Sequence, residues 1–525
     1  MRQSIRLVVN TATLLSRMAV TFGIGLYITR LLLDLLGATG FGLLAALGAT
    51  GTMLTMLTPS LSTGAIRNMA FELGRSDPER SIRVFNATLV IFGLMALLML
   101  GAGLLAAGPL LSALQIPAGR EQVAAIVYYV TLAQLCTTTA ATPFAGAVEA
   151  RQAMGQVAAG EVGRSLLNLA SVGSILLFDG DPLVVYSWAL LVATLVRIAA
   201  NATIAMLRFQ EVRIRPSAVR WSEVRGLASF TGWTTLIRVG APLHAQAAVV
   251  LLGIAFSPVV TAAYGVAMRL RGYQSNFMKV LPRVVQPAMT TREALGDREY
   301  LRSLALMTSK YSAAGALFFV VPLVLEAPGV LALWLKHVPP DTAIFVRITL
   351  VWVTLQALAT GIDQGIIAQG SVRGYGLLTM SVWIGSVALC AFWFFACGFG
   401  PISLAWTYVG ATLVHLGVTV GIGTKRIDLP ARRWLREVVW PISAPFVPAL
   451  AAALAVHHAL SDAWPRYLAV GLAYGVVAAP LSWWWAIGPK EKRALTRAAD
   501  LARQRALRVL TRAEPSRDAT LPRTP

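Results

Sequence analysis

The stretch YGVAMRLRGYQSNFMKVLPRVVQPAMT, residues 264–290, is apolar enough to cross a bilayer but contains Arg269, Arg271, Lys279 and Arg283. A charge near the bilayer centre costs about 2.5–3.5 kcal/mol on insertion scales, so several charges on one helix are not expected to face hydrocarbon. At about 100° per residue, the small, amide and cationic side chains fall on one helix face. That face comprises Gly265, Arg269, Asn276, Lys279 and Arg283.

The depth of each cation in the membrane indicates whether its side chain extends to the lipid headgroups or lines a cavity. Lys279 and Arg283 lie near one end of the segment, where long side chains can extend to the lipid headgroups. Arg269 and Arg271 lie about two or three turns from the other end, which is too deep for such extension. We therefore expect Arg269 and Arg271 to line a water-filled cavity.

Composition places the chain in a membrane. The 525 residues are 56% hydrophobic and only 13% charged, with a mean hydropathy of +0.66. Soluble domains are about 25% charged, so we predict an all-α polytopic membrane protein. The formal net charge of +21 would suggest nucleic-acid binding in a soluble protein. Here the basic residues gather between apolar segments, so we expect no nucleic-acid partner.

The distribution of basic residues predicts an orientation. Apolar runs of about 20 residues, each long enough for a transmembrane helix, occur roughly fourteen times along the chain. If the N-terminus is cytoplasmic and the segments alternate, only Arg120, Lys336 and Arg466 lie in loops on the opposite side. This is the positive-inside pattern, and it predicts that both termini are cytoplasmic. It also accounts for most of the net charge.

The two halves of the chain are similar to each other. Phe41-Gly42 and Tyr264-Gly265 each occur near the start of a predicted helix, and similar Gln-bearing turns follow at 144–155 and 362–374. Such order predicts a parallel repeat: two pseudo-symmetric bundles of about six helices around a central cavity, followed by two further helices. The predicted divisions are an N-terminal lobe (1–210), a C-terminal lobe (211–426), transmembrane helices 13 and 14 (427–489) and a basic cytoplasmic tail (490–525).

Cations outnumber acids inside the predicted segments. Arg30 and Asp34 lie four residues apart on one helix and are expected to pair. The other clear acid at depth is Asp363. A cavity lined by unpaired arginines attracts an anion, and the guanidinium group suits bidentate contacts with phosphate. The further cations within segments include Arg17, Arg197 and Arg238.

Motifs for catalysis or cofactor binding are missing from the sequence. It has no G-x-x-x-x-G-K-[ST] phosphate loop, no H-E-x-x-H and no G-x-S-x-G. The three cysteines form no C-x-x-C pair, and the five histidines have no metal-ligand spacing. We therefore predict no catalytic residue, no metal and no cofactor, and a protein that is not an enzyme.

Several stretches, taken as a series, resemble a known superfamily. They are LLGATGFGLL (35–44), GAIRNMAFELGRSDPE (64–79), FAGAVEARQAMGQ (144–156), AAYGVAMRL (262–270) and LPRVVQPAMTTREALGD (281–297). The series is similar to the multidrug, oligosaccharidyl-lipid and polysaccharide (MOP) exporters, and within them to Wzx-type flippases of the polysaccharide transporter family. The likeness covers most of the chain.

The resemblance implies a flippase that moves an undecaprenyl-pyrophosphate-linked oligosaccharide across the bacterial inner membrane by alternating access. It implies membrane lipids and a polysaccharide polymerase and synthesis complex as further partners, for surface polysaccharide biosynthesis. Its cationic cavity would correspond here to Arg17, Arg238, Arg269 and Arg271, to which the helix face adds Lys279. Alternating access requires a gradient of H⁺ or Na⁺, and Asp363 is the candidate ion-coupling residue.

Two other functions stay open at this point. A MATE-like multidrug or cation antiporter would have the same fold, although more acidic residues at depth would be expected. A polytopic polysaccharide polymerase or ligase would have a large extracytoplasmic loop with convergent acid, base and arginine residues. The longest predicted loops on that side, near 111–122 and 326–341, are short.

Overall fold

The computed structural model describes residues 2–56, 58–75, 77–151, 154–221, 224–225, 240–278, 280–370, 373–488 and 491–492. Within these ranges the regular elements are all helical, as predicted. In chain order the α-helices are α1 (Arg2–Leu54), α2 (Thr58–Gly74), α3 (Pro78–Ala113), α4 (Glu121–Ala140), α5 (Thr142–Ala150), α6 (Met154–Gly173), α7 (Pro182–Arg208), α9 (Gly240–Ala255), α10 (Pro258–Met278), α11 (Val280–Ala294), α12 (Arg298–Leu325), α13 (Ala327–Trp334), α14 (Thr342–Ala368), α15 (Arg373–Phe395), α16 (Ile402–Arg426), α17 (Ala431–Trp434), α18 (Trp440–Ala459) and α19 (Trp464–Leu481). Short 3₁₀ turns span Ser174–Leu176 and Pro216–Ala218, and π-helical turns span Leu435–Val439 and Ser482–Ala486.

Acidic caps start three of these helices. Asp77, Asp181 and Asp297 each accept a hydrogen bond from a backbone N–H of the first turn, at 3.0, 2.9 and 3.2 Å. Pro78 and Pro182 follow two of these caps, at the position where proline's missing N–H is harmless. Each cap satisfies an otherwise unpaired N–H, so the chain turns sharply into the next helix.

Ten helices in the described part of the chain are long and apolar enough to cross a membrane. The helix α1 combines two apolar runs across a kink at Gly37, whose φ of 67° favours glycine. The polar side chains of α6 and α10, and the 16-residue length of α9, keep these helices out of that count. A polytopic membrane protein is therefore confirmed, whereas the count of about fourteen segments stays a prediction.

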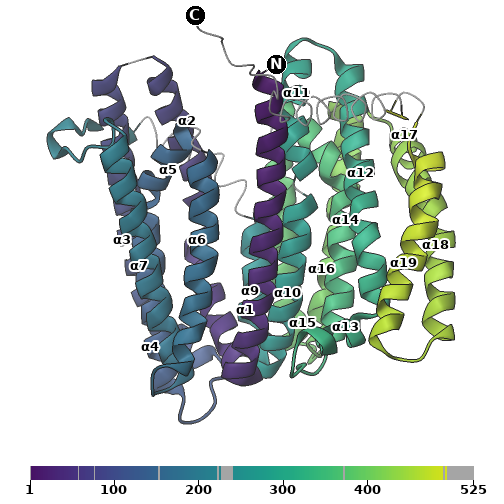
Figure 1. Cartoon of the computed structure of the whole chain (residues 1–525), viewed down its shortest axis with the longest axis horizontal. Coiled ribbons are helices and arrows are strands. Elements are labelled where there is room, and N and C mark those ends of the chain that lie inside the picture. The colour runs from purple at the N-terminus through teal and green to yellow at the C-terminus, as the bar shows by residue number, and fades with distance from the viewer. Residues whose placement is uncertain are drawn as a thin grey trace, which may run out of the picture.

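The helices form two groups with α1 between them (Figure 1). The helices α2–α7 lie on one side of α1, α10–α16 lie on the other, and α18 and α19 lie beside α12 at the outer edge. This order follows the predicted lobes and the appended pair, although the limits at 210, 426 and 489 stay predictions. We call the face at which α1 begins the N-face and the face at which it kinks the far face.

At the far face the two groups pack through the repeated aromatic-glycine pairs. A Cβ atom on Gly42 would lie 1.8 Å from the carbonyl oxygen of Pro258, at the start of α10. A Cβ on Gly265 would lie 3.4 Å from atoms of both Phe41 and Ala45. Small residues permit such close helix contacts in membranes. The two halves therefore meet through the residues that reveal their similarity in the sequence.

Polar contacts complete this junction. The backbone N–H of Gln115, before α4, donates to the carbonyl of Gly253 in α9 at 2.9 Å. The indole N–H of Trp334 donates to the carbonyl of Leu26 at 3.0 Å. Asp34 pairs with Lys336, and no ion pair between Arg30 and Asp34 is found among the described residues. The expected intrahelical pair is therefore replaced by a contact between the two halves.

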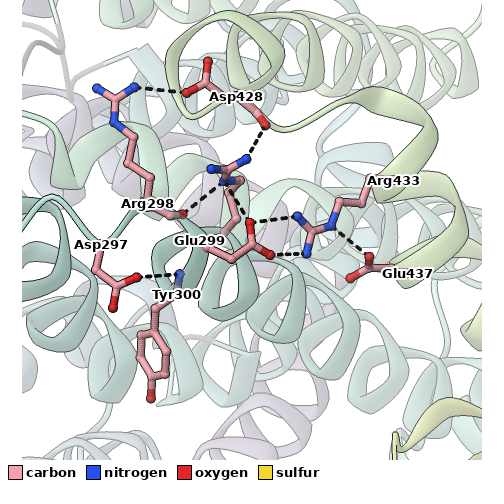
Figure 2. A network of polar contacts seen from close by, with 8 residues as sticks. Asp297, Arg298, Glu299, Tyr300, Asp428, Arg433 and Glu437 are labelled. Carbon is pink, nitrogen blue, oxygen red and sulfur yellow. Dashed lines mark hydrogen bonds and ion pairs between the residues drawn. The ribbon is translucent and has the colours of Figure 1, made fainter.

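Ion pairs also organise the N-face beside α12 (Figure 2). Arg298 contacts Asp428 at 3.0 Å, and Arg433 contacts both Glu299 and Glu437 at 2.8 Å. These exposed pairs contribute about 0.2–1 kcal/mol each. Together they join the start of α12 to the connection between α16 and α18.

Buried charges hold the last two helices against α12. The carboxylate of Glu326, only 1% exposed, contacts Arg466 at 2.9 Å and the Nδ1 atom of His457 at 2.7 Å. At the N-face, Lys310 contacts Glu491 at 2.8 Å. A buried charge without such partners would be strongly destabilising. Apart from residues 491–492, the predicted basic tail (490–525) lies outside the described part of the chain.

Candidate functional site

A cavity of about 1260 Å³ lies between the two groups of helices. Side chains from α1, α4, α6, α7, α10–α14 and α19 line it. Sites for drug-sized ligands measure roughly 300–1,000 Å³, so this cavity can hold a larger molecule. Its charged lining residues are Glu161, Arg164, Arg197, Arg269, Arg283 and Glu326.

Arg269 lines the cavity and also contacts α1. Its Nη1 atom donates to the hydroxyl of Thr29 at 3.1 Å, and its Cζ atom lies 5.2 Å from the ring centroid of Phe41. Asn276 and Arg283, which share the helix face of Arg269, line the same cavity, whereas the sequence left open whether Arg283 would extend to the lipid headgroups. None of Arg197, Arg269 and Arg283 forms an ion pair within the described ranges, so each keeps its charge available to an anion.

Two further cations come from the N-terminal group of helices. Arg164 in α6 contacts Glu161 at 2.7 Å, and Arg197 in α7 interacts electrostatically with both. The sequence places Arg197 only among the cations within segments and does not single out Arg164. The signal that could have identified them is a charged pair spaced i, i+3 at the start of one segment, with an arginine inside the next.

Arg271 occupies a different place from Arg269. It is not among the cavity-lining residues. Its guanidinium lies 3.8 Å from the ring centroid of Trp352, and its Nη2 atom donates to Gln356 Oε1 at 3.2 Å. Residues two apart on a helix point about 200° from each other, so the two arginines face opposite directions. The geometry gives Arg271 a packing contact with α14, and direct substrate binding by this residue stays a prediction.

Asp363 lies in a polar cluster outside the cavity lining. Its Oδ1 atom accepts hydrogen bonds from the hydroxyls of Tyr375 in α15 and Thr419 in α16, the latter at 3.4 Å. These two hydroxyls are 3.0 Å apart. No basic partner of Asp363 is found in the described ranges. A carboxylate held only by hydroxyl groups can exchange a proton or contact a cation.

The side chains of three predicted binding residues lie outside the described part of the structure. Arg17 belongs to α1, but its side chain is outside the described part of the structure. Arg238 and Lys279 also lie outside the described residues. Their roles in binding stay predictions.

The cavity's chemistry differs between its walls. Phe319, Val320, Leu323 and Val330, from α12 and α13, form an apolar side. The described part of the chain contains no cluster of three or more potential metal-ligating side chains, and its three cysteines are unpaired. What the arrangement offers is a cationic, partly polar chamber that can hold an anion by charge and hydrogen bonds.

A family model now identifies the chain. The model described as polysaccharide biosynthesis protein matches residues 7–291. The chain belongs to this family. The match agrees with the resemblance to polysaccharide transporters, and the fold is shared with a transporter of the MOP superfamily. No curated protein matches the sequence.

Solved structures share the fold of this polysaccharide biosynthesis protein. The lipid II flippase MurJ, in an inward closed conformation, is similar with a TM-score of 0.69 and 12% identity, covering 90% of this chain and 98% of that chain. An inward-facing multidrug resistance MATE transporter of the MOP superfamily is similar with a TM-score of 0.66 and 16% identity, covering 78% of this chain and 98% of that chain. The MATE multidrug transporter DinF-BH in complex with R6G is similar with a TM-score of 0.59 and 15% identity, covering 80% of this chain and 96% of that chain. These neighbours are a flippase and transporters rather than enzymes, and at such identities they establish the fold alone.

Proposed function

We propose that this polysaccharide biosynthesis protein is a flippase for an undecaprenyl-pyrophosphate-linked oligosaccharide. The observation that carries the proposal is the cavity between the two helix groups, where Arg197, Arg269 and Arg283 form no ion pair among the described residues. A pyrophosphate diester carries two negative charges, and arginine binds such oxygens with paired hydrogen bonds. The family match to polysaccharide biosynthesis supports a glycan as the cargo.

Transport proceeds by alternating access between the two helix groups. An anionic, sugar-bearing headgroup cannot cross about 30 Å of hydrocarbon unaided. A water-filled cationic chamber lets the headgroup cross while its lipid tail stays in the bilayer. The N-face is cytoplasmic in this proposal because the basic loops lie there, and the membrane is the bacterial inner membrane.

Ion coupling is assigned to Asp363. Its contacts with Tyr375 and Thr419 tie together three helices of the C-terminal group, α14, α15 and α16. Taking up H⁺ or Na⁺ would change the charge of this cluster and the hydrogen bonds between those helices. An Asp363→Asn variant, which keeps the shape but cannot be charged, is expected to bind substrate and to lose transport driven by an ion gradient.

The alternative functions predict different cellular outcomes. The cargo of a MATE-like exporter would be a drug or cation, and an arginine-lined cavity would repel any cationic cargo. In cells that lack the protein, a flippase leaves lipid-linked repeat units accumulated on the cytoplasmic leaflet, with the polymer lost. A polymerase or ligase defect leaves the precursor accessible from the periplasm, and loss of a drug exporter changes toxin sensitivity with the glycan intact. Leaflet accessibility of the labelled precursor in the deletion strain distinguishes these cases.

A further inference from the structure

The N-terminal helices contribute a hydrogen-bonding wall to the cavity. The α4–α6–α7 wall consists of Gln134 and Thr138 from α4, Asn168 from α6, and Thr194 and Arg197 from α7. Amides and hydroxyls both donate and accept hydrogen bonds, whereas ionised phosphate oxygens only accept them. The acceptors of this wall are therefore superfluous for a pyrophosphate. They match the hydroxyl groups of a sugar, which donate as well as accept.

Contacts within the wall fix the orientation of its groups. The amide nitrogen of Gln134 donates to the hydroxyl of Thr194 at 2.9 Å. This contact leaves the amide oxygen of Gln134 without a hydrogen-bond partner among the described residues. In α6, the pair between Glu161 and Arg164 presents a carboxylate and a guanidinium together at 2.7 Å. Such preset groups bind a polyol with less loss of side-chain freedom.

The other walls differ from this one, because α12 is apolar and the amides of Gln274 and Asn276 in α10 lie between the cations Arg269 and Arg283 along the chain. Phe319, Val320 and Leu323 on α12 offer no side-chain hydrogen bonds. On the α10–α11 side, the charges of Arg269 and Arg283 match the pyrophosphate. We infer that the glycan binds to the α4–α6–α7 wall, and that Gln134 and Asn168 are specificity-determining residues that read its hydroxyl groups. This inference rests on the proposed function and adds to it the side of the cavity that recognises sugar.

The test compares two lipids on the purified full-length protein in lipid nanodiscs. One probe is the lipid-linked repeat unit extracted from the deletion strain, and the other is undecaprenyl pyrophosphate, which has no sugar. Wild type is expected to bind the sugar-bearing lipid more tightly. Gln134→Ala and Asn168→Ala are each expected to weaken that binding about fivefold to tenfold, as for the loss of one hydrogen bond, with undecaprenyl pyrophosphate affinity unchanged.

Controls separate binding from folding. Asn168→Gln keeps an amide in the wall and should retain more affinity than Asn168→Ala, and unfolding temperatures without ligand check that each variant is folded. Arg269→Gln should weaken binding of both lipids. Equal wild-type affinity for the two lipids would overturn the inference that the glycan binds to the α4–α6–α7 wall. Equal losses of affinity for both lipids in the alanine variants would overturn it as well. Failure of wild type to bind either lipid would instead contradict the proposed function, and with it the inference about the α4–α6–α7 wall.

Discussion

The carboxylate of Asp34 and the ammonium group of Lys336 lie 2.6 Å apart, and their contact joins α1 to the connection between α13 and α14. It belongs to the same far-face junction as the hydrogen bond between Gln115 and Gly253. This junction joins the two helix groups at the far face, while the cavity lies between the helix groups. The proposed alternating access to the far face would require these contacts to separate.

Breaking this ion pair should favour separation of the two groups. The Lys336 side chain is 55% exposed, so the pair contributes only about 0.2–1 kcal/mol, which corresponds to a shift of up to about fivefold in the open population. Lys336→Asp is expected to increase the long-distance fraction between spin labels at residues 122 and 340, measured by pulsed electron resonance. The double variant Asp34→Lys, Lys336→Asp should restore the wild-type distribution. Unchanged distances in the single variant would show that this ion pair does not hold the two helix groups together.

The glycines of the two aromatic-glycine pairs should respond differently to alanine. At Gly42 the new methyl group would lie 1.8 Å from a backbone carbonyl oxygen, whereas at Gly265 its nearest contacts are 3.4 Å away. Overpacking of this kind costs about 1–3 kcal/mol. Gly42→Ala is therefore expected to lower the unfolding temperature of the purified protein, and Gly265→Ala should leave it nearly unchanged. Equal shifts in both variants would contradict the close contact between α1 and α10.

Charge at Arg269 should matter more than side-chain bulk. Losing a hydrogen bond to a charged group costs about 1.5–3 kcal/mol, which is roughly a 10-fold to 100-fold loss of affinity. Arg269→Gln should lose that much affinity for undecaprenyl pyrophosphate, and Arg269→Lys should retain part of it. Arg238, outside the described residues, carries the same expectation.

Arg271 provides the matched comparison. Because its guanidinium stacks on Trp352 outside the cavity lining, Arg271→Lys should lower the unfolding temperature more than it lowers affinity for undecaprenyl pyrophosphate. Binding and unfolding are measured on the same preparations of the Arg269 and Arg271 variants. A larger affinity loss in Arg271→Lys than in Arg269→Lys would indicate that Arg271, and not Arg269, is the binding residue.

The ion pair of Arg151 and Glu211 should make stability depend on pH. Burial alone would raise the pKa of Glu211, but two hydrogen bonds from Arg151 at 2.7 Å help to hold this pKa below its ordinary value. Because the pKa is lower in the folded state, the contribution is present above the unfolded pKa of about 4.3 and is lost as pH falls through the folded pKa. Glu211→Gln should therefore destabilise the protein at pH 7 and much less below about pH 4. An equal loss of stability in Glu211→Gln at both pH values would contradict this link between the Glu211 carboxylate and stability.

Sequence periodicity could predict the helical class, the placement of Arg269 and the meeting of similar halves, but it left open whether Arg283 lines the cavity or extends to the lipid headgroups. Each of these depends on residues within one segment or on a repeated pattern. The pairing of Asp34 with Lys336 could not be predicted, because its partners are far apart in sequence and a nearer cation, Arg30, was available. The separation of Arg271 from the cavity depends on where Trp352 in α14 packs, which no local pattern specifies.

The most direct test of the central claim is flipping of a fluorescent undecaprenyl-pyrophosphoryl oligosaccharide in liposomes that contain only this protein. An impermeant quencher added outside measures how much of the lipid reaches the outer leaflet, with an applied H⁺ or Na⁺ gradient. We predict gradient-dependent exposure with wild type, exposure near that of empty liposomes with Arg269→Gln, and intermediate exposure with Arg269→Lys. Exposure no greater than in empty liposomes with wild type under either gradient, or undiminished exposure with Arg269→Gln, would contradict a flippase that works through its cationic cavity.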